Sequence, residues 1–233
     1  MVKKIIITGG LGYIGTELCK IYSGVSWHHK ITVIDNRFIS ERVNQIRNWN
    51  MEFIHGDILN EELVNKVFKD ADVVHHLAGV TDVPRTKSEA TDEKNDKIKL
   101  VGEKGTENIL NAINKNCKII FPSTHVVYEG VNEVRTDIKE HEKTQPVLSY
   151  SSSKAVNEKQ LKESGKRYII LRLGSVYGYS TDTARIDIMP NLFSKISSQN
   201  GTLKLFAGGR QLKSLVPLID VARCFKFMEE RDD

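Results

Sequence analysis

A glycine-rich turn between an apolar strand and a helix constrains this 233-residue chain more than any other feature. The segment Lys4–Thr8 is short, apolar and β-branched, and the pattern Gly9-x-x-Gly12-x-x-Gly15 follows it directly. A helix is expected over about Ile14–Ser23. Glycines at this spacing allow a tight turn, a close approach of the backbone to a pyrophosphate, and close packing of the helix on the strand. The chain therefore opens with the βα unit of a dinucleotide-binding fold.

Strand-like segments recur along the chain, separated by longer amphipathic patterns. After the first strand we predict strands over Ile31–Asp35, Glu52–His55, Asp72–Leu77, Lys118–Phe121 and Tyr168–Leu173. Continuous apolar strands that alternate with helices are typical of a parallel sheet covered on both faces, with right-handed crossovers. The predicted fold class is α/β, a doubly wound parallel sheet of the Rossmann type.

The regular alternation ends near Gly174. Beyond it we expect a helix over Met189–Ser198, short strands over Leu203–Phe206 and Leu215–Leu218, and a last helix over Asp220–Glu230. We predict an NAD-binding Rossmann domain over residues 1–173 and a partial substrate-binding region, interleaved with it, over residues 174–233. Because the last helix lies at the end of the chain, this C-terminal part is expected to be small and incomplete.

An acidic residue accompanies the glycine turn at the expected distance. Asp35 ends the second strand, twenty positions after Gly15. Its carboxylate can accept hydrogen bonds from the hydroxyls of an adenosine ribose, and its charge repels the 2′-phosphate of NADP. We therefore predict NAD as the cofactor. Arg37 carries the opposite charge nearby and works against this preference, and a glycine turn unrelated to any cofactor is the plainer alternative.

Charge and composition exclude several classes of partner. The 34 basic and 30 acidic side chains are spread along the chain, so no arm for nucleic acid is predicted. The N-terminal apolar run ends too early for a signal peptide, and no stretch is long enough to span a membrane. The cysteines lie far apart, which favours a reducing, cytoplasmic location and neither a zinc nor a redox site: they are Cys19, Cys117 and Cys224.

Two histidine pairs, His28-His29 and His75-His76, are the only hint of a metal site in the sequence. Neighbours on a strand point to opposite faces, and no cluster of carboxylates or cysteines accompanies either pair. We therefore predict structural or surface roles for these histidines and no bound metal.

Tyr150 and Lys154 are spaced i, i+4 in the segment Tyr150–Glu163, which has a helical pattern. Both side chains then project from one face of the helix. A free phenol has a pKa of about 10, and a nearby ammonium group can lower it toward neutrality. Tyr150 is thus a candidate general base for a sugar hydroxyl, although this spacing alone is a frequent accident on helices.

Several motifs together, in their order along the chain, carry a family resemblance. They are Thr8-Gly9-x-x-Gly12-x-x-Gly15, Gly56-Asp57-Ile58, His76-Leu77-Ala78-Gly79, Ser123-Thr124, Tyr150-x-x-x-Lys154 and Leu171-Arg172-Leu173-Gly174-Ser175-Val176-Tyr177-Gly178. The chain resembles the extended short-chain dehydrogenases/reductases, and within them the NAD-dependent epimerase/dehydratase branch. The resemblance extends from Lys3 to about Ala222.

The resemblance implies roles for individual residues. Tyr150 would be the base, Lys154 would hold the nicotinamide ribose and tune Tyr150, and Thr124 would bond the reacting sugar oxygen. Ser175 would contact the substrate, where many relatives carry asparagine. The implied cofactor contacts, besides Tyr150 and Lys154, are Gly9, Gly12, Tyr13, Ile14, Gly15, Asp35, Asn36, Asp57, Ile58, Leu77, Ala78 and Gly79.

The implied activity is that of a nucleotide-sugar epimerase that oxidises and re-reduces the C4 position of the sugar. A dehydrogenase/reductase, a dehydratase, or a non-catalytic dinucleotide-binding sensor stay as alternatives. Family dehydratases follow the catalytic threonine with an Asp-Glu pair, whereas His125 and Val126 stand here, which favours epimerisation or simple oxidoreduction. Relatives commonly form homodimers through helices that would here run over about Asp92–Asn114 and Ser149–Glu163.

The sequence also departs from the family pattern. Gly102 stands where relatives usually carry asparagine, and Lys213 replaces a frequent arginine. These departures affect the expected substrate contacts. The sequence does not identify the sugar or the nucleotide.

Overall fold

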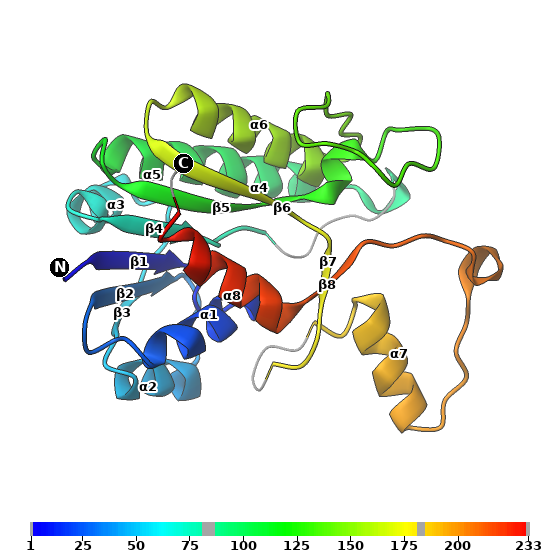
Figure 1. The fold of residues 1–233 in the computed structure, drawn as a ribbon, viewed down its shortest axis with the longest axis horizontal. Helices are drawn as coiled ribbons and strands as arrows, with labels where there is room; N and C mark the ends of the chain where they lie inside the picture. The colour runs from blue at the N-terminus through cyan, green and yellow to red at the C-terminus, as the bar shows by residue number, and fades with distance from the viewer. Residues whose placement is uncertain (1, 81–86, 181–184, 232–233) are drawn as a thin grey trace.

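The computed structural model describes residues 2–80, 87–180 and 185–231, and its centre is a six-stranded parallel sheet (Figure 1). The strand order is β3-β2-β1-β4-β5-β6. The strands are β1 (Lys4–Thr8), β2 (Lys30–Asp35), β3 (Glu52–His55), β4 (Val73–His76), β5 (Lys118–Thr124) and β6 (Arg167–Leu173). This confirms the predicted doubly wound sheet. The largest error in the strand bounds is in β5, which continues through Pro122 to Thr124.

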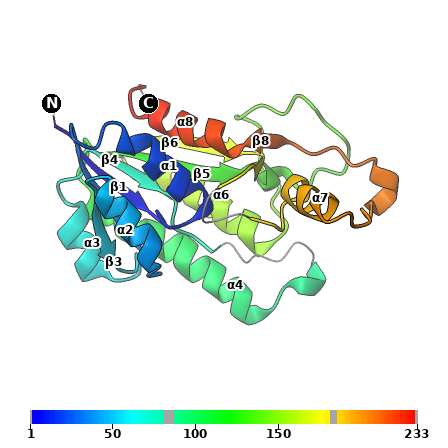
Figure 2. The same ribbon diagram turned by 90° about the horizontal axis from the view of Figure 1, so that it is seen from below.

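Helices cover both faces of this sheet (Figure 2). The α-helices of the described residues are α1 (Tyr13–Ser23), α2 (Ser40–Asn48), α3 (Glu61–Phe68), α4 (Asp92–Lys99), α5 (Gly105–Ala112), α6 (Ser149–Glu163), α7 (Met189–Ser198) and α8 (Leu218–Met228), of which α7 does not cover the sheet. Side chains of β1 alternate between two cores, as expected for a strand. Ile5 and Ile7 join a core with α1, α2 and α8, whereas Ile6 joins a core with α3, α5 and α6.

The expected helix over Asp92–Asn114 is interrupted. A π-helical segment, η2 (Leu100–Lys104), separates α4 from α5. Gly102 lies within it, and its carbonyl oxygen accepts hydrogen bonds from Thr106 Oγ1 at 2.6 Å and Asn157 Nδ2 at 3.0 Å. Glycine has low helix propensity, and side-chain donors that bind a helix carbonyl compete with the regular backbone pattern. Such π segments are frequent at functional sites.

The C-terminal part differs from the prediction in one element. A second sheet pairs β7 (Ser175–Tyr177) with β8 (Leu215–Pro217), and α7 has the predicted bounds. The expected strand over Leu203–Phe206 is wrong: residues 201–205 are exposed and irregular, and a short 3₁₀ helix, η4 (Phe206–Gly209), follows. Gly208 and Gly209 have φ values of +65° and +73°, which an extended strand does not permit.

The division into residues 1–173 and 174–233 stays a prediction. The last helix of the chain returns to its first part. α8 packs against α1, while α7 lies away from the six-stranded sheet (Figure 1). The last helix ends at Met228, two residues before its predicted end. Within the described ranges, no helix is long and apolar enough to cross a bilayer.

A buried polar cluster fastens the end of α8 to the sheet. Glu229 accepts hydrogen bonds from Lys3 at 2.7 Å, Tyr22 at 2.7 Å and Lys226 at 2.8 Å. The Tyr22 hydroxyl also lies 2.6 Å from Nε2 of His75, and burial lowers the pKa of His75 to about 3. His75 is therefore a neutral, structural residue. The cluster joins α1, β4 and the C-terminal end of α8.

Candidate active site

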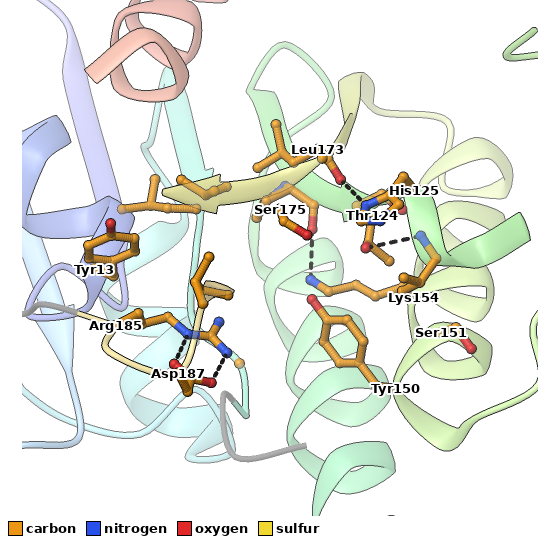
Figure 3. A pocket seen from close by; sticks show the side chains of 18 of the residues that line it. Tyr13, Thr124, His125, Tyr150, Ser151, Lys154, Leu173, Ser175, Arg185 and Asp187 are labelled. Atoms are coloured by element: carbon orange, nitrogen blue, oxygen red, sulfur yellow. Dashed lines mark hydrogen bonds and ion pairs between the residues drawn. The ribbon is translucent and has the colours of Figure 1, made fainter. Parts of the chain in front are cut away.

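A cavity of about 1150 Å³ opens at the carboxyl ends of β1, β4, β5 and β6 (Figure 3). The sheet order reverses between β1 and β4, and open α/β sheets bind ligands in the crevice at this switch point. Sites for one small molecule usually measure roughly 300–1,000 Å³. The volume here exceeds that range.

The glycine turn forms one wall of the cavity in the predicted way. Gly9 has a φ of +67°, and a Cβ there would lie 2.8 Å from the amide nitrogen of Ala78. A Cβ on Gly15 would lie 2.3 Å from the carbonyl oxygen of Gly9. Only glycine therefore permits this close approach of backbone segments at the start of α1. The predicted residues that line the cavity here are Gly9, Gly12, Tyr13, Ile14, Gly15, Leu77, Ala78 and Gly79.

Four predicted cofactor residues lie beside the turn and do not line this cavity. Asp35 is buried, and its carboxylate accepts hydrogen bonds from Leu11 N and Arg37 N, each at 3.0 Å. Asn36 donates to Asp57 at 3.0 Å. Ile58 is buried, next to Asp57. Asp35 and Asp57 thus stand together at the ends of neighbouring strands, where the sequence places the adenosine half of a dinucleotide.

Thr124, Tyr150 and Lys154 come together at the opposite side of the cavity, from the end of β5 and the first turns of α6 (Figure 3). Nζ of Lys154 donates to the carbonyl oxygen of Pro122 at 2.7 Å and lies 5.9 Å from the centre of the Tyr150 ring. The Thr124 hydroxyl accepts from Val126 N at 3.3 Å, so its own hydrogen can be donated to a ligand. Ser123 instead donates to Glu158 at 2.6 Å.

Burial dominates the electrostatics of Tyr150 and Lys154. Burial lowers the pKa of Lys154 to about 7. Burial also raises the pKa of Tyr150, and the charge that opposes this rise belongs to Arg185 and not to Lys154. Burial therefore has the larger effect on the pKa of Tyr150 in this structure, and the tuning of Tyr150 by Lys154 stays a prediction.

Three residues that depart from the family pattern line the cavity: Gly102, Ser175 and Lys213. Ser175 begins β7. A Cβ on Gly102 would lie 2.6 Å from Oγ of Ser153. An asparagine at position 102 would therefore require the Ser153 side chain to move.

His76 links the strand to the π segment through buried hydrogen bonds. Its Nδ1 lies 3.0 Å from Thr8 Oγ1 and its Nε2 lies 3.0 Å from Thr106 Oγ1. Because the Thr106 hydroxyl donates to Gly102, it accepts from Nε2, which assigns the tautomer. Burial lowers the pKa of His76 to about 3. Within the described part of the chain, no three metal-ligating side chains lie together.

Glu129 is a site residue whose role the sequence did not reveal. Its Oε1 accepts hydrogen bonds from Val147 N at 2.9 Å, Leu148 N at 2.7 Å and the hydroxyl of Ser151. The carboxylate therefore holds the backbone that leads into α6 and the side chain of Ser151 in its first turn, beside Tyr150. No motif marks Glu129, because its partners lie 18 to 22 positions later in the chain.

Arg185, Asp187 and Asn191 were also missed. Arg185 and Asp187 line the cavity and form an ion pair at 3.2 Å (Figure 3). Asn191, in the first turn of α7, bonds to Tyr13, Gly178 and Arg185. No motif marks these residues, because they lie in the irregular part of the sequence.

Comparison with protein families agrees with this geometry. The family model described as "NAD dependent epimerase/dehydratase family" matches residues 5–233 of this chain. The chain belongs to this family. The match confirms the predicted extended short-chain dehydrogenase/reductase family and NAD as its cofactor, and it assigns the chain to a family of nucleotide-sugar epimerases and dehydratases.

Individual relatives differ in their reactions. The chain is 26% identical to a dTDP-D-glucose 4,6-dehydratase from Dictyostelium discoideum, over 96% of this chain and 55% of the relative. It is 27% identical to a UDP-glucose 4-epimerase from Azospirillum brasilense, over 75% of this chain and 49% of the relative. The chain thus spans about half the length of these relatives.

A solved structure of UDP-glucuronic acid 4-epimerase from Bacillus cereus, in complex with UDP-glucuronic acid and NAD, has a similar fold. The TM-score is 0.80 at 25% identity, and the alignment covers 99% of this chain and 74% of that one.

Proposed function

We propose that this protein is an NAD-dependent nucleotide-sugar epimerase that acts at C4 of the sugar. The observation that carries the proposal is the placement of Thr124, Tyr150 and Lys154 on one wall of a cavity whose other wall is the glycine turn. The cavity exceeds the usual size of a site for one small molecule, which supports a site shared by the nicotinamide end of NAD and the sugar.

The chain's residues fit NAD. The close backbone contacts at Gly9 and Gly15 leave the N-terminus of α1 open to the pyrophosphate, and Asp35 is placed for the adenosine ribose. Lys154 would hold the nicotinamide ribose. When bound, NAD supplies a hydride acceptor at C4 of the sugar and afterwards a hydride donor.

Tyr150 then handles the proton that accompanies the hydride. Its phenolate oxygen takes the proton of the C4 hydroxyl as C4 becomes a ketone, and the phenol gives the proton back when C4 is reduced from the other face. Thr124 donates a hydrogen bond to the same sugar oxygen and keeps it in place. Arg185, which opposes the rise in the pKa of Tyr150, makes the phenolate easier to form.

The acidic residues of the cavity favour epimerisation over 4,6-dehydration or decarboxylation. Dehydration needs a base for the C5 proton and an acid for the leaving hydroxyl. Of the described residues that line the cavity, only Glu129 and Asp187 are acidic. Glu129 is bonded to the backbone that leads into α6, and Asp187 pairs with Arg185. His125, which follows Thr124, donates through Nδ1 to the carbonyl oxygen of Leu173 at 2.9 Å.

Product mass tests the proposal. The protein is incubated with NAD and a panel of nucleotide sugars, and products are separated and weighed. An epimer has the mass of its substrate, a dehydrated sugar has lost water, and a decarboxylated one has lost carbon dioxide. A Tyr150→Phe variant serves as the control for turnover. A dehydrated product that disappears in His125→Ala would refute the epimerase and make His125 catalytic.

A dehydratase is the second candidate, because the chain is 26% identical to the 4,6-dehydratase and 27% identical to the 4-epimerase, which is almost the same. A dinucleotide-binding sensor would bind NAD tightly without converting any sugar of the panel. The predicted homodimer and cytoplasmic location stay predictions.

A further inference from the structure

Asn191 connects parts of the cavity that are far apart in sequence. Its Nδ2 donates to the Tyr13 hydroxyl at 3.1 Å and to the carbonyl oxygen of Arg185 at 2.9 Å. Its Oδ1 accepts from the amide of Gly178 at 2.9 Å. Both the nitrogen and the oxygen of the Asn191 amide thus make hydrogen bonds. The side chain is half-buried at the start of α7.

Tyr13 completes the link from the other side. It is the first residue of α1 and belongs to the glycine turn, and its hydroxyl donates to the carbonyl oxygen of Gly178. Gly178 is therefore held at its N–H by Asn191 and at its C=O by Tyr13. Its φ of +130° lies in the left-handed region, so the backbone there has a conformation that few residues adopt.

The backbone that Asn191 bonds, at Gly178 and Arg185, leads into one wall of the cavity. We call Gly178 and residues 185–192 the Arg185 wall; Arg185, Asp187 and Leu192 of this wall line the cavity. Arg185 also acts electrostatically on both Tyr13 and Tyr150, so it lies within range of the turn and of the predicted base. Figure 3 shows Tyr13, Arg185 and Tyr150 around the same space.

We propose that Asn191 is a positioning residue that, with Tyr13, couples occupancy of the glycine turn by NAD to the order of the Arg185 wall. The proposal rests on the proposed function only in requiring NAD at the turn. A pyrophosphate bound at the N-terminus of α1 restrains the backbone of Tyr13, and the Tyr13 hydroxyl then restrains Gly178 and Asn191. By reciprocity, a ligand that orders the Arg185 wall tightens the binding of NAD.

Hydrogen exchange of backbone amides with and without NAD tests this coupling. Tyr13→Phe removes only the hydroxyl and leaves Asn191 bonded to Gly178 and Arg185. Asn191→Leu removes the link from the other side at similar volume. Ser194→Ala is the matched control, because Ser194 lies on the same helix and donates only locally, to Pro190 at 2.8 Å.

In the unmodified protein and in Ser194→Ala, NAD should slow exchange both in the glycine turn and at the amides of Gly178 and Leu192. The effect at these two amides should be at least about fivefold, the lower end of common couplings between sites. At NAD concentrations that saturate each variant, the slowing at Leu192 should fall below about twofold in Tyr13→Phe and Asn191→Leu. Gly178 is compared only in Tyr13→Phe, because Asn191→Leu removes the acceptor of its amide. Direct contact of NAD with the Arg185 wall would not be removed by Tyr13→Phe.

Three results would overturn the inference. NAD could protect the turn but not the Arg185 wall of the unmodified protein, the wall could stay protected in Tyr13→Phe, or Ser194→Ala could lose the effect. In each of them the protected turn leaves the proposed NAD site standing. Protection at neither place would refute that site and the coupling with it.

Discussion

Replacing Glu229 by glutamine should destabilise the protein strongly at neutral pH, although it changes only one carboxylate oxygen to an amide. The Glu229 side chain is 1% exposed and accepts hydrogen bonds from Lys3, Lys226 and Tyr22. Glutamine keeps the size of the side chain but loses both ion pairs. The contacts that hold the C-terminal end of α8 to the sheet would then contribute less to the free energy of unfolding.

The pKa of Glu229 gives the magnitude. Burial would raise it, but the hydrogen bonds from Lys226, Lys3 and Tyr22 prevail and lower it from 4.5 to about 2. A pKa difference of about 2.5 between the unfolded and the folded chain corresponds to roughly 3 kcal/mol. Lys3 is partly exposed, so screening by solvent reduces the expected loss to about 2–3 kcal/mol.

The lowered pKa of Glu229 determines how this stabilisation depends on pH. The stabilisation is fully present above about pH 4.5, where the unfolded chain is also ionised, and it is lost as the pH falls through about 2. Near pH 3 less than about half of it should remain.

Urea denaturation of both proteins at pH 7 and pH 3, followed by circular dichroism, measures the difference. Glu230→Gln is the matched control, because Glu230 is exposed and lies 3.9 Å from Lys226. A loss in Glu229→Gln no larger than in Glu230→Gln would refute the reasoning. An equal loss at both pH values would show that the charge is not its source.

Three further predictions concern the site. Tyr150→Phe should keep NAD binding, measured by calorimetry, and lower turnover at least about a hundredfold, the usual contribution of a general base; full activity would mean that another residue is the base. Because burial lowers the pKa of Lys154 from 10.5 to about 7, the folded protein without ligand releases a proton that the unfolded chain retains. Its stability should therefore gain from this group as the pH rises from about 7 to 10.5, and thermal melts of Lys154→Met should lack that gain. Calorimetry should also show tighter binding of NAD than of NADP, because Asp35 repels a 2′-phosphate; equal binding would mean that Arg37 compensates for this charge.

The strands and the glycine turn could be predicted because their signals are local. Apolar β-branched runs bounded by polar residues identify a strand without knowledge of its neighbours, and all six strands of the main sheet were found in this way. The turn was equally readable, since Gly9 and Gly15 are required by backbone contacts only a few residues away. The spacing of Tyr150 and Lys154 on one helix is also local.

The two errors of secondary structure arose where a local pattern lacked a tertiary partner or met an unexpected one. The apolar residues of Leu203–Phe206 resemble a strand, but among the described residues of this region only β7 and β8 pair with each other. The helix expected over Asp92–Asn114 is interrupted at Gly102, whose carbonyl oxygen is bonded by Asn157 from another helix. A strand needs a neighbour to bond to, and a helix can be bent by a distant donor.

The sequence by itself determined the sheet, the turn that fits NAD, and the helix that carries Tyr150 and Lys154, because each depends on residues within a few positions of one another. Only the tertiary structure decided what surrounds them. Asn191 reaches Tyr13 across 178 positions, and Glu129 bonds backbone N–H groups 18 and 19 positions later. Many of these contacts join a side chain to a backbone N–H or C=O, which every residue except proline provides in full. They therefore leave no signature in the amino-acid types, and only the folded chain selects the partners.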